Sequence, residues 1–294
     1  MTEFAIGIDG GGTSCRAAVA DRTGKIIGRG KAGAANILSD LDTSLTNIAA
    51  SARKAFRDAG LDPAGVESAS AAVGVAGANV GDYGSRIQQA LPFAHSRILT
   101  DALISLQGAV GDADGVVGAF GTGSVYSARR GGVVTEIGGW GFVVGDQASG
   151  ARLGRDLLER ALLAHDGVRP ASPLTDKIML EFGNDPERVV EFAHKSKPKD
   201  FARFAPEVVA HADLRDPIAV AIMRTAVRAI EENLDRLLWP ECPTICLLGG
   251  LAAAYRPWLN PTYRGMLAEP KGDALEGAVA FALHMARDGE RPDA

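Results

Sequence analysis

The sequence has few of the residues that mark secreted, membrane-bound or nucleic-acid-binding proteins. It holds only three cysteines in 294 residues, too few for a disulfide framework. No apolar run approaches the roughly 18 residues that a membrane helix needs, and the chain opens on Met1-Thr2-Glu3 instead of the positive charge of a signal peptide. Lys and Arg form no block longer than a pair, and the net charge is −5. We therefore expect a cytoplasmic protein with a small-molecule partner, and neither membrane nor nucleic acid as a partner.

Metal-binding and common nucleotide-binding motifs are scarce as well. Cys242 and Cys246 have no second cysteine pair, and the five histidines show no ligand spacing. A P-loop is excluded because Gly24-Lys25 is followed by Ile26. The stretch Gly28-x-Gly30-x-x-Gly33 has dinucleotide spacing, but it follows a third strand-like run instead of opening a βαβ unit, which disfavours a Rossmann site.

The periodicity of the first third predicts a mixed sheet with helices on its faces. Three short apolar runs are separated by a glycine-rich loop and a polar turn, and apolar residues then recur at helical spacing as far as Gly60. The strands expected are Phe4–Ile8, Ser14–Ala20, Lys25–Gly30, Ala69–Ala76 and Arg97–Thr100, and the helices are Leu41–Ala59, Arg86–Leu91 and Ala102–Val110. The predicted order is βββαβαβα.

The second half of the chain begins as the first does. A shift of 111 residues places Gly7-x-x-Gly10-Gly11-Gly12-Thr13 on Gly118-x-x-Gly121-Thr122-Gly123-Ser124. This repeat indicates duplication and two lobes with a cleft between their paired loops, namely residues 1–112 and residues 113–273. The second lobe carries a helix-rich insertion from about Ala151 to Leu238, followed by a strand over Thr244–Leu248. We expect the final helix, about 274–287, to pack back on the first lobe.

The two glycine loops suggest a phosphate site. A lone glycine cluster is equally well explained as a tight turn. Two hydroxyl-ended loops at matching places are suited to hold a polyphosphate through backbone N–H groups. Asp9 would be repelled by phosphates unless a cation lay between them, which predicts that Asp9 holds Mg²⁺ directly or through water.

Motifs along nearly the whole chain resemble those of a known superfamily. The segments "IGIDGGGTS", "GVAGAN", "LTDALISLQGA", "GAFGTGS", "GGWGFVVGDQASGARLGR" and "LLGG" occur in the order of the phosphate, connecting and adenosine segments of actin-like ATPases and sugar kinases. The sequence is most similar to the BadF/BadG/BcrA/BcrD type, and within it to N-acetylglucosamine and glucosamine kinases. The resemblance implies an α/β fold of two ribonuclease H-like (actin-like ATPase) lobes. It also implies a homodimer that uses ATP and Mg²⁺ to phosphorylate an amino sugar or hexose, at the C6 hydroxyl.

The same resemblance assigns roles to particular residues. Asp101 matches the catalytic base, although from spacing alone Thr100 or Asp101 could be a helix N-cap. The sugar contacts it implies are Asn36, Asp101, Gly139, Trp140, Gly141 and Asp146. The ATP contacts it implies are Gly11, Gly12, Thr13, Gly121, Thr122, Gly123, Gly249 and Gly250. Without the resemblance, Trp140 would be taken as a core residue and Asn36 as a turn residue.

Relatives commonly have a glutamate where this chain has Gln147, which leaves the preferred sugar open between N-acetylglucosamine, glucosamine and another hexose. Two other functions also stay open. Related activators drive electron transfer from an iron–sulfur cluster, but here no cysteine lies between Cys15 and Cys242. A sugar sensor without catalysis would not need Asp9 and Asp101.

Overall fold

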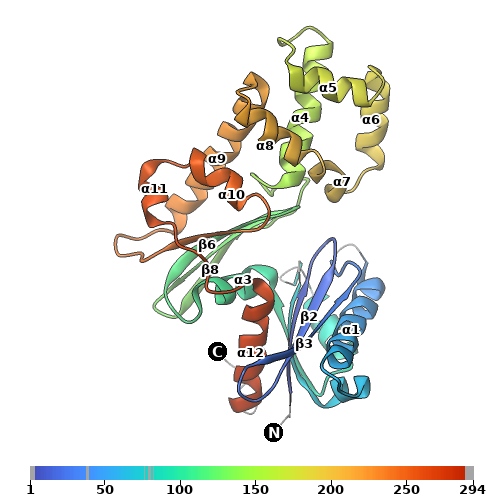
Figure 1. Cartoon of the computed structure of the whole chain (residues 1–294), viewed down its shortest axis with the longest axis vertical. Coiled ribbons are helices and arrows are strands. Elements are labelled where there is room, and N and C mark those ends of the chain that lie inside the picture. Colours follow the sequence, from blue (N-terminus) through green and yellow to red (C-terminus); the bar gives the residue numbers. More distant parts are fainter. Residues whose placement is uncertain (1–3, 38–39, 76, 79–80, 82, 289–294) are drawn as a thin grey trace. The chain divides into compact units, whose positions relative to one another are not determined.

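The computed structural model describes residues 4–37, 40–75, 77–78, 81 and 83–288, and the strands in these residues form two sheets (Figure 1). The pattern of contacts between residues divides the chain into two units. Unit 1 comprises Met1–Asp114, Arg129–Val134 and Glu269–Ala294, and unit 2 comprises Gly115–Ala128 and Thr135–Ala268. The carboxyl-terminal segment thus belongs to the unit that the amino terminus begins.

Unit 1 contains the larger sheet, with strand order β3-β2-β1-β4-β5. Its strands are β1 (Ala5–Gly10), β2 (Cys15–Ala20), β3 (Ile26–Ala32), β4 (Ser70–Val75) and β5 (His95–Thr100). Strands β1, β2 and β3 are antiparallel neighbours, whereas β4 runs parallel to β1 and to β5. The register pairs Gly10 with Val75 and Val75 with Thr100, so three parallel strands end at one edge of the sheet.

Successive side chains of β1 point to opposite faces of the sheet, which explains how helices cover both faces. The helices of unit 1 are α1 (Leu41–Asp58), η1 (Pro63–Ser68), α2 (Tyr83–Ala90), α3 (Asp101–Val110) and α12 (Ala274–Asp288). Ile6 and Ile8 are buried in the core that α1 closes, whereas Ala5 lies in a separate cluster with α12. A Cβ on Gly7 would lie 2.3 Å from the backbone N of Val279, so the glycine allows α12 to lie against the strand. Figure 1 shows α1 and α12 on opposite faces.

Unit 2 has a smaller sheet with strand order β8-β7-β6-β9. Its strands are β6 (Gly115–Phe120), β7 (Ser124–Arg130), β8 (Val133–Gly138) and β9 (Ile245–Leu248), and the hairpin end of β7 and β8 falls in the segment Arg129–Val134 of unit 1. Its helices are α4 (Gly150–His165), α5 (Pro173–Glu181), α6 (Pro186–Lys195), α7 (Pro198–Ala202), α8 (Ala205–Asp213), α9 (Pro217–Leu237), α10 (Ala252–Tyr255), η2 (Arg256–Trp258) and α11 (Pro261–Met266). One continuous apolar core joins this sheet to the helices.

The order βββαβαβα predicted for the first third is confirmed, apart from the short 3₁₀ helix η1. Helix α1 ends before Gly60, which has φ +73°. The predicted end of β4 at Ala76 lies outside the described residues. In both sheets three successive strands are followed by a parallel neighbour of the first, β4 for β1 and β9 for β6. The repeated glycine motif therefore sits at the same place in two similar sheets.

All three cysteines are buried. Burial raises the pKa of the Cys15 thiol to about 11. Among the helices of the described residues, none combines the length and apolar character needed to cross a membrane.

Candidate active site

The first glycine loop follows β1 and is tied to a second segment of unit 1. The Gly11 N–H donates to the Ser14 carbonyl over 3.0 Å, which closes the turn between β1 and β2. The Ala35 N–H donates to the Gly11 carbonyl over 2.9 Å. This bond places Asn36 beside the loop that contains Gly11, Gly12 and Thr13.

Several glycines in the predicted phosphate and adenosine segments have no conformational or packing reason to be glycine. A Cβ built on Gly12, Gly121 or Gly250 would meet no heavy atom of the described residues within 4 Å, and none of these residues has a positive φ. In contrast, a Cβ on Gly249 would lie 2.3 Å from the Phe120 carbonyl oxygen, and this residue has φ +88°. Open space where a side chain would project is what a closely approaching phosphate requires, so the loops fit a polyphosphate.

Asp9 lies at the end of β1 and pairs with a residue that the sequence analysis did not single out. The Arg16 guanidinium donates to Asp9 Oδ2 over 2.6 Å and to Asp273 Oδ2 over 2.9 Å. Burial opposes the positive charge of Arg16, but both carboxylates favour it and its pKa is raised overall. The second oxygen of Asp9 has no hydrogen bond among those the structure gives for the described residues, and the side chain is partly exposed.

This donor set fits Mg²⁺ only as a shared site. Among the described residues, no three His, Cys, Asp or Glu side chains converge as metal ligands. Mg²⁺ commonly uses one or two carboxylates and completes its shell with waters and substrate phosphates. A single partly exposed carboxylate beside an open glycine loop meets that requirement.

Asp101 lies at the same edge of the sheet as Asp9, just after β5. Two strand spacings separate β1 from β5, so the backbones at Gly10 and Thr100 are about 10 Å apart. The Thr100 hydroxyl accepts the Leu103 N–H over 3.0 Å and is the N-cap of α3, while Asp101 Oδ1 accepts the Ala102 N–H. Of the two capping candidates, Thr100 fills the position. Asp101 is the first residue of α3 and uses one carboxylate oxygen at the helix start without being its N-cap.

In unit 2, the second glycine loop and the Gly249–Gly250 segment also share one sheet edge. Strand β6 pairs in parallel with β9, with Ala119 opposite Leu248, and each is followed by glycines. The Gly150 N–H at the start of α4 donates to the Gly121 carbonyl over 2.8 Å. The Leu251 N–H donates to the Phe120 carbonyl over 3.3 Å. These bonds fix both segments against the end of β6.

Asp146 holds together the loop that carries the other predicted sugar contacts. Its Oδ1 accepts the Gly141 N–H over 3.1 Å, and the Ser124 N–H also hydrogen-bonds to it. Burial raises the pKa of Asp146, and these bonds oppose the rise. Gly139 and Gly141 have φ +71° and +87°, which explains both glycines. Asp146 thus shapes the loop, whether or not it also contacts a ligand.

Trp140 lies outside the core, whereas without the family resemblance the sequence would have placed it there. Its exposed fraction is 70%, and Val143 and Val144 beside it are also exposed. A Cβ on Gly145 would lie 2.9 Å from Trp140 Cβ, so the loop folds closely on itself and directs this indole outward. An exposed indole on a fixed loop is suited to contact a flat apolar face of a ligand.

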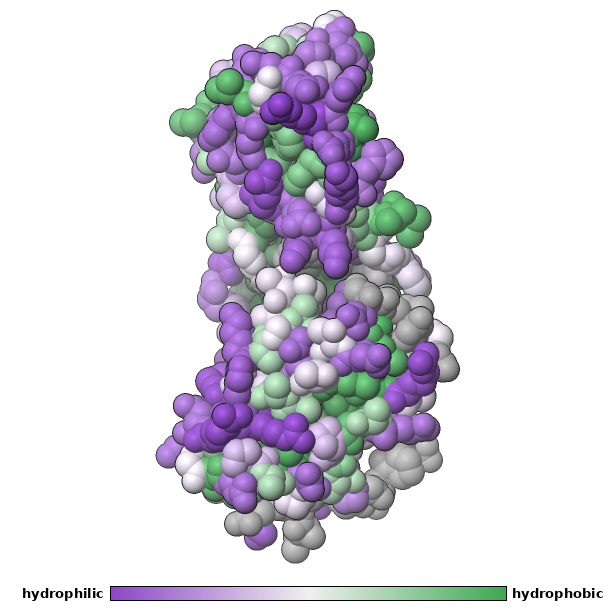
Figure 2. Space-filling view, turned by 90° about the vertical axis from the view of Figure 1, so that its right-hand side faces the viewer, coloured by the Kyte–Doolittle hydropathy of each residue, from purple (hydrophilic) through white to green (hydrophobic). Residues whose placement is uncertain are grey.

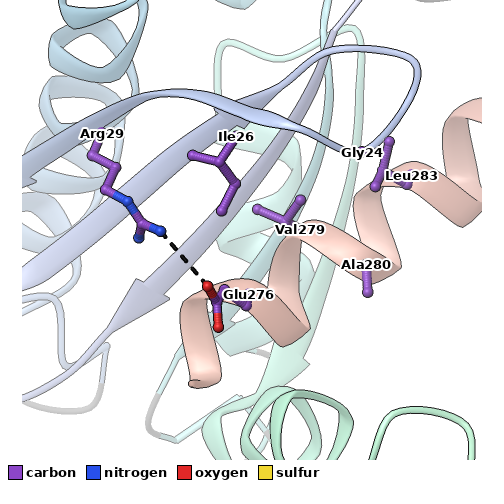
Figure 3. Close-up of a pocket in the computed structure, with 7 residues that line it drawn as sticks. All are labelled: Gly24, Ile26, Arg29, Glu276, Val279, Ala280 and Leu283. Carbon is purple, nitrogen blue, oxygen red and sulfur yellow. Dashed lines mark ion pairs between the residues drawn. The ribbon is translucent and has the colours of Figure 1, made fainter. Parts of the chain in front are cut away.

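The two cavities that the structure gives are lined by none of the predicted site residues. One, of about 400 Å³, lies between β3 and α12, where Arg29 and Glu276 form an ion pair over apolar side chains (Figure 3). Ile26 pairs with Ala20, and Ala20 with Ala5, which places this cavity at the opposite end of the sheet from Asp9. The other, of about 520 Å³, lies beside α4 and includes Asp156 and Arg169. The predicted residues lie instead at or after strand ends, within each unit separately.

Arg16 and the residues that support the 139–149 loop were not predicted from the sequence. Arg16 follows a predicted turn at a distance of seven residues from Asp9, which is the spacing of partners across a short hairpin. That pattern could have indicated the pair. Ser124 and Arg152 lie in motifs noted in the sequence, but their hydrogen bonds to the loop were not predicted. Tyr255 bonds to the loop from 107 residues away, and nothing in the local sequence marks it.

Two similar sheets with glycine loops at their edges define the architecture of the actin-like ATPase and sugar kinase superfamily. Residues 6–282 match the BadF/BadG/BcrA/BcrD ATPase family. The chain is 35% identical over 280 residues to the glucosamine kinase GspK of Vibrio cholerae, covering 95% of each protein. It is 27% identical to an N-acetylmuramic acid/N-acetylglucosamine kinase of Clostridium acetobutylicum, covering 95% of this chain and 98% of that one. A crystal structure from Chromobacterium violaceum, of a protein named as a candidate N-acetylglucosamine kinase, superposes with TM-score 0.88 and 33% identity, covering 96% of this chain and 99% of that one.

The chain therefore belongs to the BadF/BadG/BcrA/BcrD ATPase family, with the α/β fold of two actin-like ATPase lobes.

Proposed function

We propose that this protein is an ATP-dependent kinase that phosphorylates an amino sugar, glucosamine or N-acetylglucosamine, at the C6 hydroxyl. Relatives that align over nearly the whole chain are named as kinases of these sugars. The observation that carries the proposal is Asp101, a carboxylate at the sheet edge of Asp9 whose helix-capping role is already filled by Thr100.

In this proposal Asp101 is the catalytic base. It accepts the proton of the attacking sugar hydroxyl while the γ-phosphoryl group of ATP moves in line to that oxygen. Because the transition state of phosphoryl transfer is loose, positioning and charge neutralisation supply most of the catalysis.

Asp9 would hold Mg²⁺, directly or through water, and the ion would neutralise charge on the β- and γ-phosphates. The ATP contacts proposed are Gly11, Gly12 and Thr13 in unit 1, and Gly121, Thr122, Gly123, Gly249 and Gly250 in unit 2. The open Cβ positions at Gly12, Gly121 and Gly250 support this assignment. Arg16 would orient Asp9 and balance its charge before the metal binds.

The sugar contacts proposed are Asn36 and Asp101 in unit 1, with Gly139, Trp140, Gly141 and Asp146 in unit 2. Trp140 would offer an apolar wall, which its exposure supports. An exposed Gln147 next to Asp146 would tolerate an N-acetyl or a free hydroxyl substituent at C2. Because ATP is a cytoplasmic substrate, we place the enzyme in the cytoplasm, and we propose a homodimer.

A panel of glucosamine, N-acetylglucosamine, N-acetylmuramic acid and glucose, each with ATP and Mg²⁺, tests the proposal by coupled measurement of ADP. At least one amino sugar should stimulate ADP formation strongly over ATP alone. Asp101→Asn should lower that rate by at least about a hundredfold while sugar binding by calorimetry persists. Thr100→Ala is the matched control: it should lower the free energy of unfolding by about 1 kcal/mol and keep most of the activity.

Other outcomes contradict the proposal. Sugar binding without ADP formation would indicate a sensor. Visible absorption of an iron–sulfur cluster in anaerobically purified protein, with no response to sugars, would indicate an activator. Normal turnover by Asp101→Asn would show that Asp101 is not the catalytic base.

A further inference from the structure

The loop of residues 139–149 contains two residues in a conformation that their side chains disfavour. Asp146 has φ +56° and Ala148 has φ +65°. An alanine in the left-handed region is strained, because its Cβ approaches the backbone and no side-chain polar group compensates. Such residues persist only where the surrounding structure holds them.

Four successive carbonyl groups of the loop, those of residues 145–148, each accept a hydrogen bond from another residue of unit 2. Arg152 donates to the Gly145 oxygen over 3.3 Å, and the Ser149 N–H donates to the Asp146 oxygen over 3.0 Å. The Ser124 hydroxyl donates to the Gln147 oxygen over 2.6 Å. The last member is Ala148, whose carbonyl accepts from the Tyr255 hydroxyl over 2.6 Å.

Tyr255 is the member of this set with the most rigid support. Its side chain is fully buried, and its ring packs edge to face on Phe120 with centroids 5.3 Å apart. It ends α10, and its N–H donates to the Leu251 carbonyl over 3.1 Å. The hydroxyl therefore has a fixed position, and a buried hydroxyl whose partner moved away would lose its hydrogen bond without gaining water.

We propose that Tyr255 is a positioning residue for substrate binding, because its hydroxyl holds Ala148 in the left-handed conformation and so fixes Asp146 and Trp140 in the loop. The assignment rests on the proposed function for the identity of the ligand as a sugar. Tyr255 itself contacts the loop backbone, so its effect passes through Asp146, which in turn holds Gly141. Among the described residues, the hydrogen bond of this hydroxyl goes to the Ala148 carbonyl and to none of the nucleotide contacts proposed above.

The chain offers a matched control in Tyr126, on the same aromatic cluster. Its ring packs edge to face on Phe120 at 5.5 Å and is almost as deeply buried as that of Tyr255. Its hydroxyl is buried and has no hydrogen-bond partner in the part of the chain that the structure describes. Tyr255→Phe and Tyr126→Phe thus remove the same atom from similar surroundings, and only one of them breaks a hydrogen bond to the loop.

The first readout is kinetic. Tyr255→Phe should raise the sugar KM about tenfold and leave the ATP KM within about twofold, because one buried hydrogen bond to the sugar-side loop is lost. Tyr126→Phe should leave both unchanged. Ala148→Gly should restore the sugar KM in the Tyr255→Phe background, since glycine adopts a positive φ without strain. An equal rise in both KM values, or no rescue by glycine, overturns the assignment.

The second readout does not depend on the proposed function. Amide hydrogen exchange of Gly141, Gly145 and Ser149, whose N–H groups bond within the loop, should speed up at least about fivefold in Tyr255→Phe, remain unchanged in Tyr126→Phe and slow again with Ala148→Gly. Unchanged exchange in Tyr255→Phe overturns the positioning role even if the protein is a sugar kinase. If the exchange responds but no sugar stimulates ADP formation in the wild type, the positioning of the loop stands and the proposed function fails.

Discussion

One guanidinium, that of Arg16, lies between two carboxylates at the sheet edge of unit 1. Asp9 and Asp273 each accept a hydrogen bond from it. All three side chains are partly exposed, so these ion pairs contribute little to stability. The arrangement leaves Asp9 with an ordered orientation and a partly exposed side chain, which a metal site shared with phosphate requires.

Asp9 and Asp273 allow the metal role to be separated from the ion pair. Asp9→Asn and Asp273→Asn each replace one carboxylate partner of Arg16 by a neutral side chain of the same size. Asp273→Asn retains the oxygen that accepts the Glu276 N–H. Asp9→Asn should lower the rate of phosphoryl transfer by about a hundredfold or more at fixed Mg²⁺, because a metal ligand is weakened. Asp273→Asn should keep activity within a few fold. Equal losses in the two variants, measured by ADP formation, would assign the effect to Arg16 instead.

Trp140 provides a second test at the scale of one residue, with Val143 as its control. Both side chains are exposed on the same loop. A sugar that covers roughly 60 Å² of the indole gains about 1.5 kcal/mol, which is about tenfold in affinity. Trp140→Ala should therefore raise the sugar KM about tenfold with little change in the ATP KM, and Val143→Ala should change neither. A large loss of thermal stability in Trp140→Ala would show that the residue is structural.

At the scale of single elements, the strands and helices of unit 1 followed from local pattern because their apolar periodicity and turn residues agree. The N-cap of α3 did not, since Thr100 and Asp101 are equally good capping residues and only the backbone geometry selects Thr100. The hydrogen bond from the Tyr255 hydroxyl to the Ala148 carbonyl also could not be predicted from the sequence. Its partner Tyr255 lies 107 residues away, and the positive φ of an alanine has no sequence pattern.

The glycines of the first strand and its loop should respond differently to the same substitution. Gly7→Ala would place a Cβ 2.3 Å from the backbone of α12 and should lower the free energy of unfolding by roughly 1–3 kcal/mol or more. Gly12→Ala projects into open space, so its thermal stability should stay close to that of the wild type. Its ATP KM should nevertheless rise, because the new methyl group occupies the approach of a phosphate. Unchanged ATP kinetics in Gly12→Ala would argue that the loop is only a turn.

At the scale of the whole molecule, the repeated motif predicted two similar sheets, and their strand orders bear this out. The chain path was less predictable, because unit 1 also takes in Arg129–Val134 and the segment from Glu269 onward. Helix α12 packs on β1, where Ala278 and Val279 lie against Gly7, and Ala278 shares an apolar cluster with Ala5, across some 270 residues of chain. Such long-range pairs depend on shape complementarity, which periodicity does not encode. The domain boundary between residues 112 and 113 stays a prediction.

Figure 2 shows that one face of the molecule mixes polar and apolar residues.

The three cysteines make the two units separately observable. Cys15 lies in the core of unit 1, and Cys242 and Cys246 are buried in unit 2. Burial excludes reagents from all three thiols, and with a pKa of about 11 only about one Cys15 in a thousand would be a thiolate at pH 8. In native protein at pH 8, no thiol should react with a maleimide on the timescale that labels a small-molecule thiol completely.

Labelling in increasing urea, followed by mass spectrometry of the peptides, then assigns each unfolding transition to a unit. Cys15 should become reactive when unit 1 unfolds, and Cys242 and Cys246 should become reactive together when unit 2 unfolds. Gly7→Ala should shift the midpoint of Cys15 labelling to lower urea, because its Cβ disrupts the contact between β1 and α12 inside unit 1. Rapid labelling of Cys15 in native protein would contradict the buried position of β2. A separation of Cys242 from Cys246 would contradict the cooperative unfolding of unit 2, to which both residues belong.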